Sequence, residues 1–445
     1  SKVEPIQPKF VDFNNDLTKA TTKNGLPVVY VKNTENGRFN LIYFYKLNGV
    51  SDKWLPIAAE YFTYLGTDKM TAEQVKQKFY GLACNYGVNV SSRYIQVYLN
   101  GLAENMPEAM ALLDDIIANA KVDTAAYNKY VGLVEKSRAD NKLNQQVNFS
   151  RLQQYGMYGA YNYARNTPSS AELKETDPQK LVDMIKALNG YRHEVLYYGP
   201  MELNELTAAV DNNHKTAKTL ADMPAEKPYE MQQTTQNEVY IAPYDAKNIY
   251  MIQFHNENRQ WNPAQEPVIS LFNEYYGGGM NTVVFQELRE ARGLAYSAFA
   301  MYGTPGFKGE PEYAYTYIIS QNDKMMDCIR TFNNILDTIP QSDKALDLAK
   351  QALMKRIATR RVTKEGIINA YLSARFLGID YDINKKVYDA VPSLTMDDVA
   401  KFEQETMAKK PYRYIILGDE KQLDMEALEK IGPIKRLTTE EIFGY

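Results

Sequence analysis

Histidine, the commonest metal-ligating side chain in proteins, is scarce in this chain. The 445 residues contain only His193, His214 and His255, and no two of them have the spacing of three or four residues that places both on one helical face. A hydrolytic zinc site needs imidazole or carboxylate ligands and a carboxylate that accepts a proton from metal-bound water. The sequence therefore predicts no metal site in this chain. A self-sufficient metalloenzyme built on these histidines stays open as a weaker alternative.

Nucleophilic and phosphate-binding motifs are equally sparse. Cys84 and Cys328 are far apart and form no CxxC pair, and the sequence contains no GxSxG motif. Serine or cysteine hydrolysis is therefore not predicted. The glycine run 277–279 in YYGGGMN resembles a phosphate cradle, but no Lys-Ser or Lys-Thr pair follows it. We predict a turn with positive φ there.

The elements that would position any site come from a unit used twice. The segment VYVKNTENGRFNLIYF from Val29 resembles VYIAPYDAKNIYMIQF from Val239, an offset of 239 − 29 = 210 residues. LPIAAEYFTYLGT resembles EPVISLFNEYYGGG at an offset of 212, and HEVLYYGPMELNEL resembles YRYIILGDEKQLDMEAL at an offset of 219. Offsets that grow in chain order indicate a diverged tandem duplication.

Within each unit, strand patterns precede amphipathic helices. Alternating apolar residues through VNVSSRYIQVYL predict strands with a break at the two serines, and apolar residues at helical spacing predict helices from Met106 and from Leu346. Thr71 and Thr395 are predicted N-caps. We therefore expect an α+β fold of two tandem homologous α/β sandwich modules, each a mostly antiparallel sheet covered by helices. The expected boundaries are an N-terminal extension over 1–19, modules over 20–222 and 239–445, and a linker over 223–238.

Charge and hydropathy exclude several classes of function. Lys and Arg total 51 against 55 Asp and Glu, a net charge of −4, and the signs are interleaved, which argues against a nucleic-acid surface. No apolar run approaches the roughly 18 to 20 residues needed to cross a bilayer, so no membrane span is expected.

One segment carries a specific resemblance. YYGGGMNTVVFQELREARGLAYS, from Tyr275 to Ser297, resembles the second-module signature of the pitrilysin/insulinase family of zinc metallopeptidases, and NGLPVVYVKN from Asn24 resembles the first strand of that family. The resemblance implies that Arg289 and Tyr296 reach toward the substrate carbonyl. An Arg fork and a phenol suit binding of a peptide backbone and stabilisation of an oxyanion. The alternative is a helix-end salt bridge and a packed tyrosine. Arg292 is a weaker candidate that could pair with Glu287 or Glu290.

The same resemblance locates a lost zinc motif. The family's inverted HxxEH aligns with residues 57–61, where Ile57 and Tyr61 replace the two histidines and Glu60 occupies the position of the general base. Glu135 falls near the distal zinc carboxylate. Two carboxylates without imidazoles do not make a tight zinc site, so we expect Glu60 and Glu135 to be ordinary solvated or paired carboxylates.

The resemblance thus implies a substrate-binding, non-catalytic half of a zinc metalloendopeptidase, with no activity alone and no cofactor of its own. Zinc is expected in an HxxEH-bearing half, located in the same precursor chain or in a separate subunit, and the expected substrate is a peptide or unfolded polypeptide. The alternative is a non-enzymatic binding or assembly subunit derived from the same family. By analogy with the family, a periplasmic or otherwise extracytoplasmic location is slightly favoured.

Overall fold

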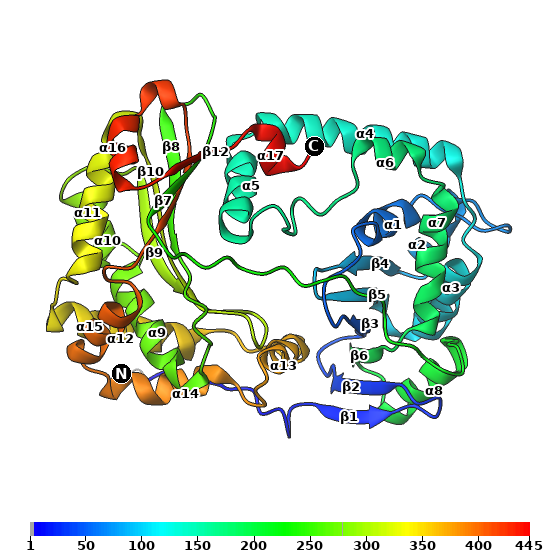
Figure 1. The fold of residues 1–445 in the computed structure, drawn as a ribbon. Helices are drawn as coiled ribbons and strands as arrows, with labels where there is room; N and C mark the ends of the chain where they lie inside the picture. Colours follow the sequence, from blue (N-terminus) through cyan, green and yellow to red (C-terminus); the bar gives the residue numbers. More distant parts are fainter. Residues whose placement is uncertain (1–3, 278) are drawn as a thin grey trace.

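The computed structural model describes residues 4–277 and 279–445 and contains two six-stranded sheets that face each other across the molecule (Figure 1). The strand order is β1-β2-β6-β3-β5-β4 in the first sheet and β12-β7-β11-β8-β10-β9 in the second. The first sheet comprises β1 (Thr18–Thr21), β2 (Pro27–Lys32), β3 (Arg38–Lys46), β4 (Cys84–Val90), β5 (Tyr94–Leu102) and β6 (Glu194–Gly199). The second comprises β7 (Glu238–Ala242), β8 (Asn248–His255), β9 (Ser297–Gly303), β10 (Tyr313–Gln321), β11 (Arg413–Leu417) and β12 (Ile434–Arg436).

Helices surround both sheets. The first module has α1 (Leu55–Phe62), α2 (Ala72–Gly81), α3 (Met106–Asn119), α4 (Thr124–Leu143), α5 (Gln145–Tyr158), α6 (Ser170–Glu175), α7 (Pro178–Lys186) and α8 (Leu203–Asn213). The second has α9 (Glu266–Phe272), α10 (Val283–Phe285), α11 (Met325–Asp337), α12 (Asp343–Thr359), α13 (Ile367–Phe376), α14 (Ile383–Ala390), α15 (Met396–Thr406), α16 (Met425–Ile431) and α17 (Thr439–Phe443). Two π-helical turns, η4 (Asn273–Gly277) and η5 (Gln286–Glu290), follow α9 and α10.

The predicted α+β fold of two related modules is confirmed. Five strands of each sheet occupy equivalent positions, and each sheet pairs most of its strands antiparallel around one equivalent parallel pair, β2 with β6 and β7 with β11. The two sheets differ at one edge, where β1 pairs antiparallel with β2 but β12 pairs parallel with β7. No helix in the described residues is long and apolar enough to cross a membrane.

Local sequence signals account for many of the elements. The four predicted apolar positions of α3, from Met106 to Ile117, are at most 2% exposed, and Leu346 begins a buried stripe on α12. Thr71 and Thr395 both form capping boxes, in which the threonine hydroxyl accepts from a backbone N–H and the partner side chain accepts in return. These predictions are confirmed.

Each module sends one helix onto the sheet of the other. Helix α5 packs against β8 and β11, where Leu152 is fully buried with Phe254 and Ile415. Helix α13 packs against the first sheet, and its Leu372 belongs to one apolar cluster with Phe44. Figure 1 shows α5 beside the second sheet and α13 beside the first. The two exchanged helices thus join the modules through two apolar clusters. Each module also has its own hydrophobic core between its sheet and its outer helices.

Candidate functional site

Helix α1 carries the residues aligned with the lost zinc motif. Ile57 is 7% exposed, and Tyr61 is fully buried. The Tyr61 hydroxyl donates to the Asp123 carbonyl at 2.8 Å and lies 3.0 Å from the Asp123 backbone N–H, so it ties α1 to the start of α4. Both histidine positions therefore hold residues that pack and stabilise the module.

The two carboxylates are also engaged. Glu60 accepts a short hydrogen bond from the Tyr130 hydroxyl, and burial, followed by this contact, raises the pKa of Tyr130. Glu135 forms an ion pair at 2.9 Å with Lys174 on α6. Glu60 and Glu135 thus contact different partners, and the residues present at this position do not fit a zinc ion. Within residues 4–277 and 279–445 no group of three His, Cys, Asp or Glu side chains is arranged to hold a metal.

A cavity of about 630 Å³ lies beside the lost motif, and we call it the motif cavity. Ile57 and Glu60 line it, whereas Tyr61 and Glu135 do not. Its other walls come mainly from α4, α5 and the loop that follows α5, with five tyrosines and two arginines among them: Tyr64, Tyr130, Tyr163, Tyr229, Tyr445, Arg138 and Arg151. Neither this cavity nor its arginines were predicted from the sequence.

Arg289 and Tyr296 lie on the outside of the second module's core. Arg289 occupies the π-helical turn η5, where its guanidinium lies 5.1 Å from the centre of the Phe285 ring. Tyr296 begins the approach to β9 and is 74% exposed, with its backbone N–H donating to the Ile319 carbonyl. Neither side chain lines the motif cavity. Arg292 lies 3.8 Å from Glu287 and forms the salt bridge that the sequence analysis named as its alternative role.

The glycine run before this segment differs from the prediction. Gly277 does not have the predicted positive φ, and position 278 lies outside the described residues. The physical reason for glycine at 277 is proximity, because a Cβ there would lie 2.6 Å from the Ala300 carbonyl oxygen. Positive φ occurs instead at Gly293, which starts the GLAY sequence.

Two of the histidines form a buried chain of hydrogen bonds that sequence reasoning missed. His193 Nε2 lies 2.9 Å from His214 Nε2, and His214 Nδ1 lies 2.9 Å from the Asp114 carboxylate. Burial, followed by the charge of His214, lowers the pKa of His193 to about 4. These hydrogen bonds join residues that are 21 and 100 positions apart in the sequence, so no local spacing could indicate them.

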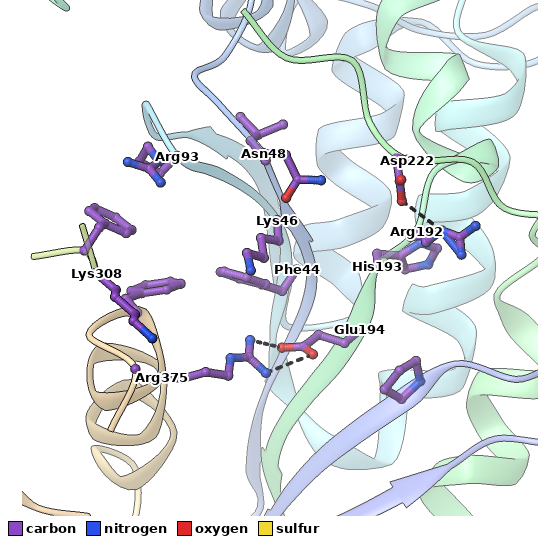
Figure 2. A pocket seen from close by; sticks show the side chains of 15 residues that line it. Phe44, Lys46, Asn48, Arg93, Arg192, His193, Glu194, Asp222, Lys308 and Arg375 are labelled. Atoms are coloured by element: carbon purple, nitrogen blue, oxygen red, sulfur yellow. Dashed lines mark hydrogen bonds and ion pairs between the residues drawn. The ribbon is translucent and has the colours of Figure 1, made fainter. Parts of the chain in front are cut away.

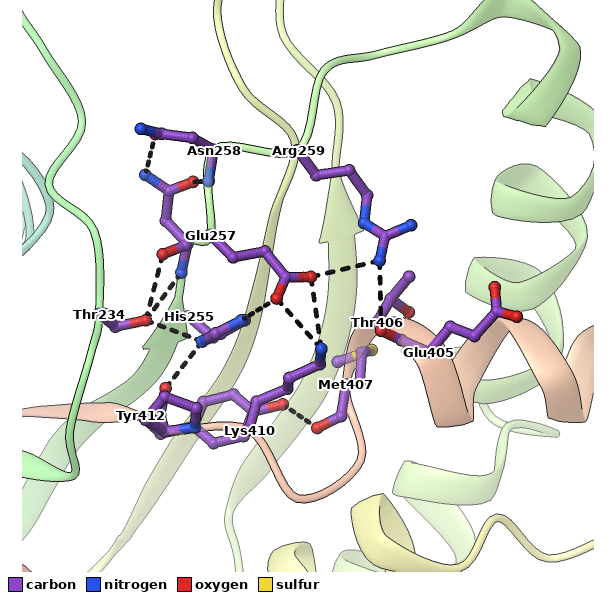
Figure 3. Close-up of polar contacts among 12 residues, drawn as sticks. Thr234, His255, Glu257, Asn258, Arg259, Glu405, Thr406, Met407, Lys410 and Tyr412 are labelled. Atoms are coloured by element: carbon purple, nitrogen blue, oxygen red, sulfur yellow. Dashed lines mark hydrogen bonds and ion pairs between the residues drawn. The ribbon is translucent and has the colours of Figure 1, made fainter.

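His255, the third histidine, is held at the end of β8 (Figure 3). Its Nδ1 lies 2.8 Å from both the Thr234 hydroxyl and the Pro411 carbonyl. Its Nε2 faces Glu257 at 3.4 Å, and Glu257 also pairs with Lys410 at 3.1 Å. These contacts connect the segment before β7 to the second sheet and give His255 a structural environment.

A second cavity, of about 600 Å³, lies where the first sheet meets α13 and the segment before β10 (Figure 2). Arg375 of α13 binds Glu194 of β6 through both carboxylate oxygens, at 2.5 and 3.1 Å. On the far wall, Arg192 pairs with Asp222 at 2.9 Å. The Arg375–Glu194 pair therefore links the two modules, whereas the Arg192–Asp222 pair lies within the first module.

Part of this chain matches a known family in sequence, and the whole chain resembles solved structures in fold. A family model described as the peptidase M16 inactive domain matches residues 179–353, from α7 to α12. No curated protein sequence matches significantly. Among solved structures, the peptidase M16 inactive domain from Pseudomonas fluorescens has a TM-score of 0.70 at 15% identity, covering 91% of this chain and 98% of that one.

Two solved proteases are about twice as long as this chain. The periplasmic protease PqqL from Escherichia coli has a TM-score of 0.70 at 11% identity, covering 93% of this chain and 46% of the protease. The ferredoxin protease FusC, solved in complex with Arabidopsis ferredoxin, has a TM-score of 0.68 at 12% identity, covering 94% of this chain and 48% of the protease. The family match and the shared fold confirm the expected resemblance: residues 179–353 match the inactive domain of the peptidase M16 family, and the chain has the fold of a solved M16 inactive domain.

Proposed function

We propose that this chain is the substrate-binding, non-catalytic half of a zinc metallopeptidase, and that it supplies Arg289 and Tyr296 to a cleavage site whose zinc is bound by an HxxEH-bearing half. One observation carries the proposal. In a chain whose zinc-motif positions are occupied by packing residues, the segment that resembles the active family keeps an Arg and a Tyr exposed and free of ion pairs with the described residues.

The local backbone supports a role for this segment. Arg289 lies on a π-helical turn, and such turns occur mostly as single insertions in helices, frequently at functional sites. A guanidinium and a phenol that face solvent contribute little to packing. They are suited to donate hydrogen bonds to a peptide carbonyl, where the negative charge of an oxyanion develops during hydrolysis.

The relatives indicate how the half would be completed. PqqL and FusC are each about twice the length of this chain, which aligns with 46% and 48% of them. We therefore expect the HxxEH-bearing half in the same precursor or in a partner subunit, and a peptide or unfolded polypeptide as substrate. A periplasmic or other extracytoplasmic location is proposed by analogy with PqqL, which is a periplasmic protease.

The test is reconstitution of peptide cleavage from the two halves. Mixed with or fused to its HxxEH-bearing half, the wild-type chain should support cleavage of a quenched fluorescent peptide. Arg289→Ala should lower kcat/KM by about 10²- to 10³-fold, the cost of removing one oxyanion donor. Its melting temperature should be nearly unchanged, since the side chain is exposed.

Arg292→Ala is the matched control, because it removes the same charge from the same segment. It should retain most of the activity. Equal activity of Arg289→Ala and wild type in the complex would reject the proposal. It would favour the alternative of a binding or assembly subunit, for which stable association with a partner lacking any peptidase motif is the diagnostic result.

A further inference from the structure

The cavity of about 600 Å³ between the first sheet and α13, which we call the intermodule cavity, has an excess of positive charge. Five cationic and two anionic side chains line it: Lys46, Arg93, Arg192, Lys308 and Arg375 against Glu194 and Asp222. Each of the three arginines has a carboxylate partner, since Arg93 pairs with Glu310 at 2.7 Å and the other two form the pairs described above. None of the ion pairs within residues 4–277 and 279–445 includes Lys46 or Lys308. Two positive charges of the lining are therefore uncompensated.

Both of these lysines are exposed, and they lie on facing sides of the intermodule cavity (Figure 2). Lys46 is the last residue of β3, whereas Lys308 belongs to the loop between β9 and β10. Neither ammonium group makes a hydrogen bond with the part of the chain that the structure describes. Their N–H donors are accordingly available to a ligand in the cavity, one set from each module.

The aliphatic stem of Lys308 is held at the end of α13. The Lys308 backbone N–H donates to the Phe376 carbonyl at 2.7 Å. A Cβ at Gly378, which has a φ of +75°, would lie 2.8 Å from the Lys308 Cδ. Glycine at this position permits both the left-handed backbone and the close approach of the lysine stem. These contacts position the charge of Lys308 without neutralising it.

Aromatic rings form an apolar wall of the same cavity. Phe44, Phe307 and Phe376 all line it, and the centre of the Phe376 ring lies 5.9 Å from that of Phe44 and 5.0 Å from that of Phe307. Such rings offer a large contact area to an apolar side chain. A ligand that matches the cavity thus combines negative charges with an apolar group.

The intermodule cavity continues toward the motif cavity. Arg93 and Phe307 also line a neighbouring space of about 240 Å³. This space in turn shares Gln154, Tyr163 and Tyr229 with the motif cavity. Three adjoining spaces suit an elongated ligand, such as an extended peptide, better than a compact one.

We propose that the intermodule cavity binds an acidic segment of a peptide, in which carboxylates accept hydrogen bonds from Lys46 and Lys308 and an apolar side chain packs on the phenylalanine wall. Charge complementarity selects the acidic segment, because the lining has two ammonium groups and no carboxylate left to pair with them. The choice of a peptide as the ligand rests on the proposed function, and the inference narrows that substrate to acidic sequences.

The test measures peptide binding to the isolated 445-residue chain by fluorescence anisotropy. Three fluorescent, end-blocked peptides of equal length contain the sequence Glu-Phe-Glu, Gln-Phe-Gln or Lys-Phe-Lys. Wild type should bind the Glu peptide about tenfold more tightly than the Gln peptide, which has the same shape without the charges, and the Lys peptide most weakly. Because no HxxEH-bearing half is present, failure of the cleavage proposal leaves this result unchanged, and loss of binding here leaves the Arg289 test unchanged.

Charge reversal separates the cavity from the general charge of the protein. Lys308→Glu and Lys46→Glu should each weaken binding of the Glu peptide by at least about tenfold, because each replaces an attraction with a repulsion. Lys344→Glu is the matched control: this exposed lysine of α12 also has no ion pair with the described residues, and it lines none of the three cavities. It changes the net charge by the same amount and should alter the affinity by less than about twofold. All three positions are exposed, so circular dichroism should show an unchanged fold.

Three outcomes would overturn the proposal. Equal affinity of wild type for the Glu and Gln peptides would show that carboxylates are not recognised. An equal loss of affinity in Lys308→Glu and Lys344→Glu would show attraction to the whole surface instead of binding in the cavity. Displacement of the Glu peptide by an equal concentration of inorganic phosphate would assign the two lysines to a phosphate-bearing ligand.

Discussion

The two modules use the same sequence, Gly-Leu-Ala, to lead from a helix into an edge strand, but the side chains around it differ in type and exposure. Residues 81–83 connect α2 to β4, and residues 293–295 connect η5 to β9, an offset of 293 − 81 = 212. At this offset Tyr296, which is 74% exposed, corresponds to Cys84, which is 3% exposed, and Arg289 corresponds to Gln77. The helix itself is regular in the first module and interrupted by a π-helical turn in the second.

This difference indicates how the duplicated unit diverged. Strand order and burial are retained, because loss of either would expose a core. The changes are concentrated where helices end and side chains reach solvent. In the first module Cys84 is buried and Gln77 is exposed, whereas in the second Tyr296 and Arg289 are both exposed. Three experiments test whether the modules are equivalent in stability while differing in chemistry.

The largest effect is expected for the exchanged helices. Leu152 of α5 is fully buried, and Leu372 of α13 is 4% exposed, each on the sheet of the opposite module. Leu152→Ala and Leu372→Ala should each reduce the free energy of unfolding by about 3 kcal/mol, the usual cost of a large cavity. Urea denaturation measures both losses. Leu348→Ala, at a position 49% exposed, should change the stability by less than about 0.5 kcal/mol, and a loss confined to one exchanged helix would show that the modules are not equivalent.

An intermediate effect is expected at Glu403, a fully buried carboxyl of the second module. Burial, followed by the charge of Asp337, raises the pKa of Glu403, which lies on α15, to about 8. The folded protein keeps this proton at pH values where the unfolded carboxyl, with a pKa near 4.5, has lost it. Stability should therefore fall as pH rises from about 4.5 to 8, by up to roughly 1.4 kcal/mol per pH unit for one proton.

Glu403→Gln should remove most of this slope when unfolding is measured at pH 5, 6.5 and 8. Glu312, whose pKa burial raises to about 7, contributes with the same sign and leaves a residual slope. Glu405→Gln removes an exposed carboxyl from the same helix and should leave the slope unchanged. A slope in Glu403→Gln that equals the wild-type slope would show that Glu403 is ionised in the folded state.

The smallest effect is expected at the two helix starts that lie 282 − 71 = 211 residues apart. Thr71 caps α2 through a capping box with Gln74, and Thr282 caps α10 through a longer bond of 3.4 Å to the Phe285 N–H. Thr71→Ala should cost about 1 kcal/mol, as measured by urea denaturation, while Thr71→Ser should cost less because it keeps the hydroxyl. Thr282→Ala should mainly accelerate amide exchange in residues 283–290. Uniform exchange along the chain in that variant would contradict a local role.

Local signals in the sequence were sufficient for many of the elements. Apolar spacing predicted α3 and α12, threonines predicted two helix starts, and the internal repeat predicted two related sheets. These features depend on residues a few positions apart, or on the order of whole segments. The assignment of Ile57 and Tyr61 to the two zinc-histidine positions rests on aligning the nearby turn at Gly66 and Thr67, and it stays a prediction.

Contacts between distant segments were not predictable. The Asp114–His214–His193 chain and the Arg138 contact with Pro168 join residues brought together only by packing. The exchange of α5 and α13 also left no sequence signal, because an apolar helix stripe does not specify which sheet it covers. The π-helical turns depend on one extra residue per turn, and helical periodicity tolerates such an insertion.

The exchanged helices determine where this molecule can move. To pivot one module relative to the other, α5 or α13 would have to leave an apolar cluster on the opposite sheet. We therefore expect the two modules to move together as one rigid body. If this chain and a second half close around a substrate, the movement must occur at the junction between the two halves. The rate at which substrate enters would then depend on that junction and not on a hinge within these 445 residues.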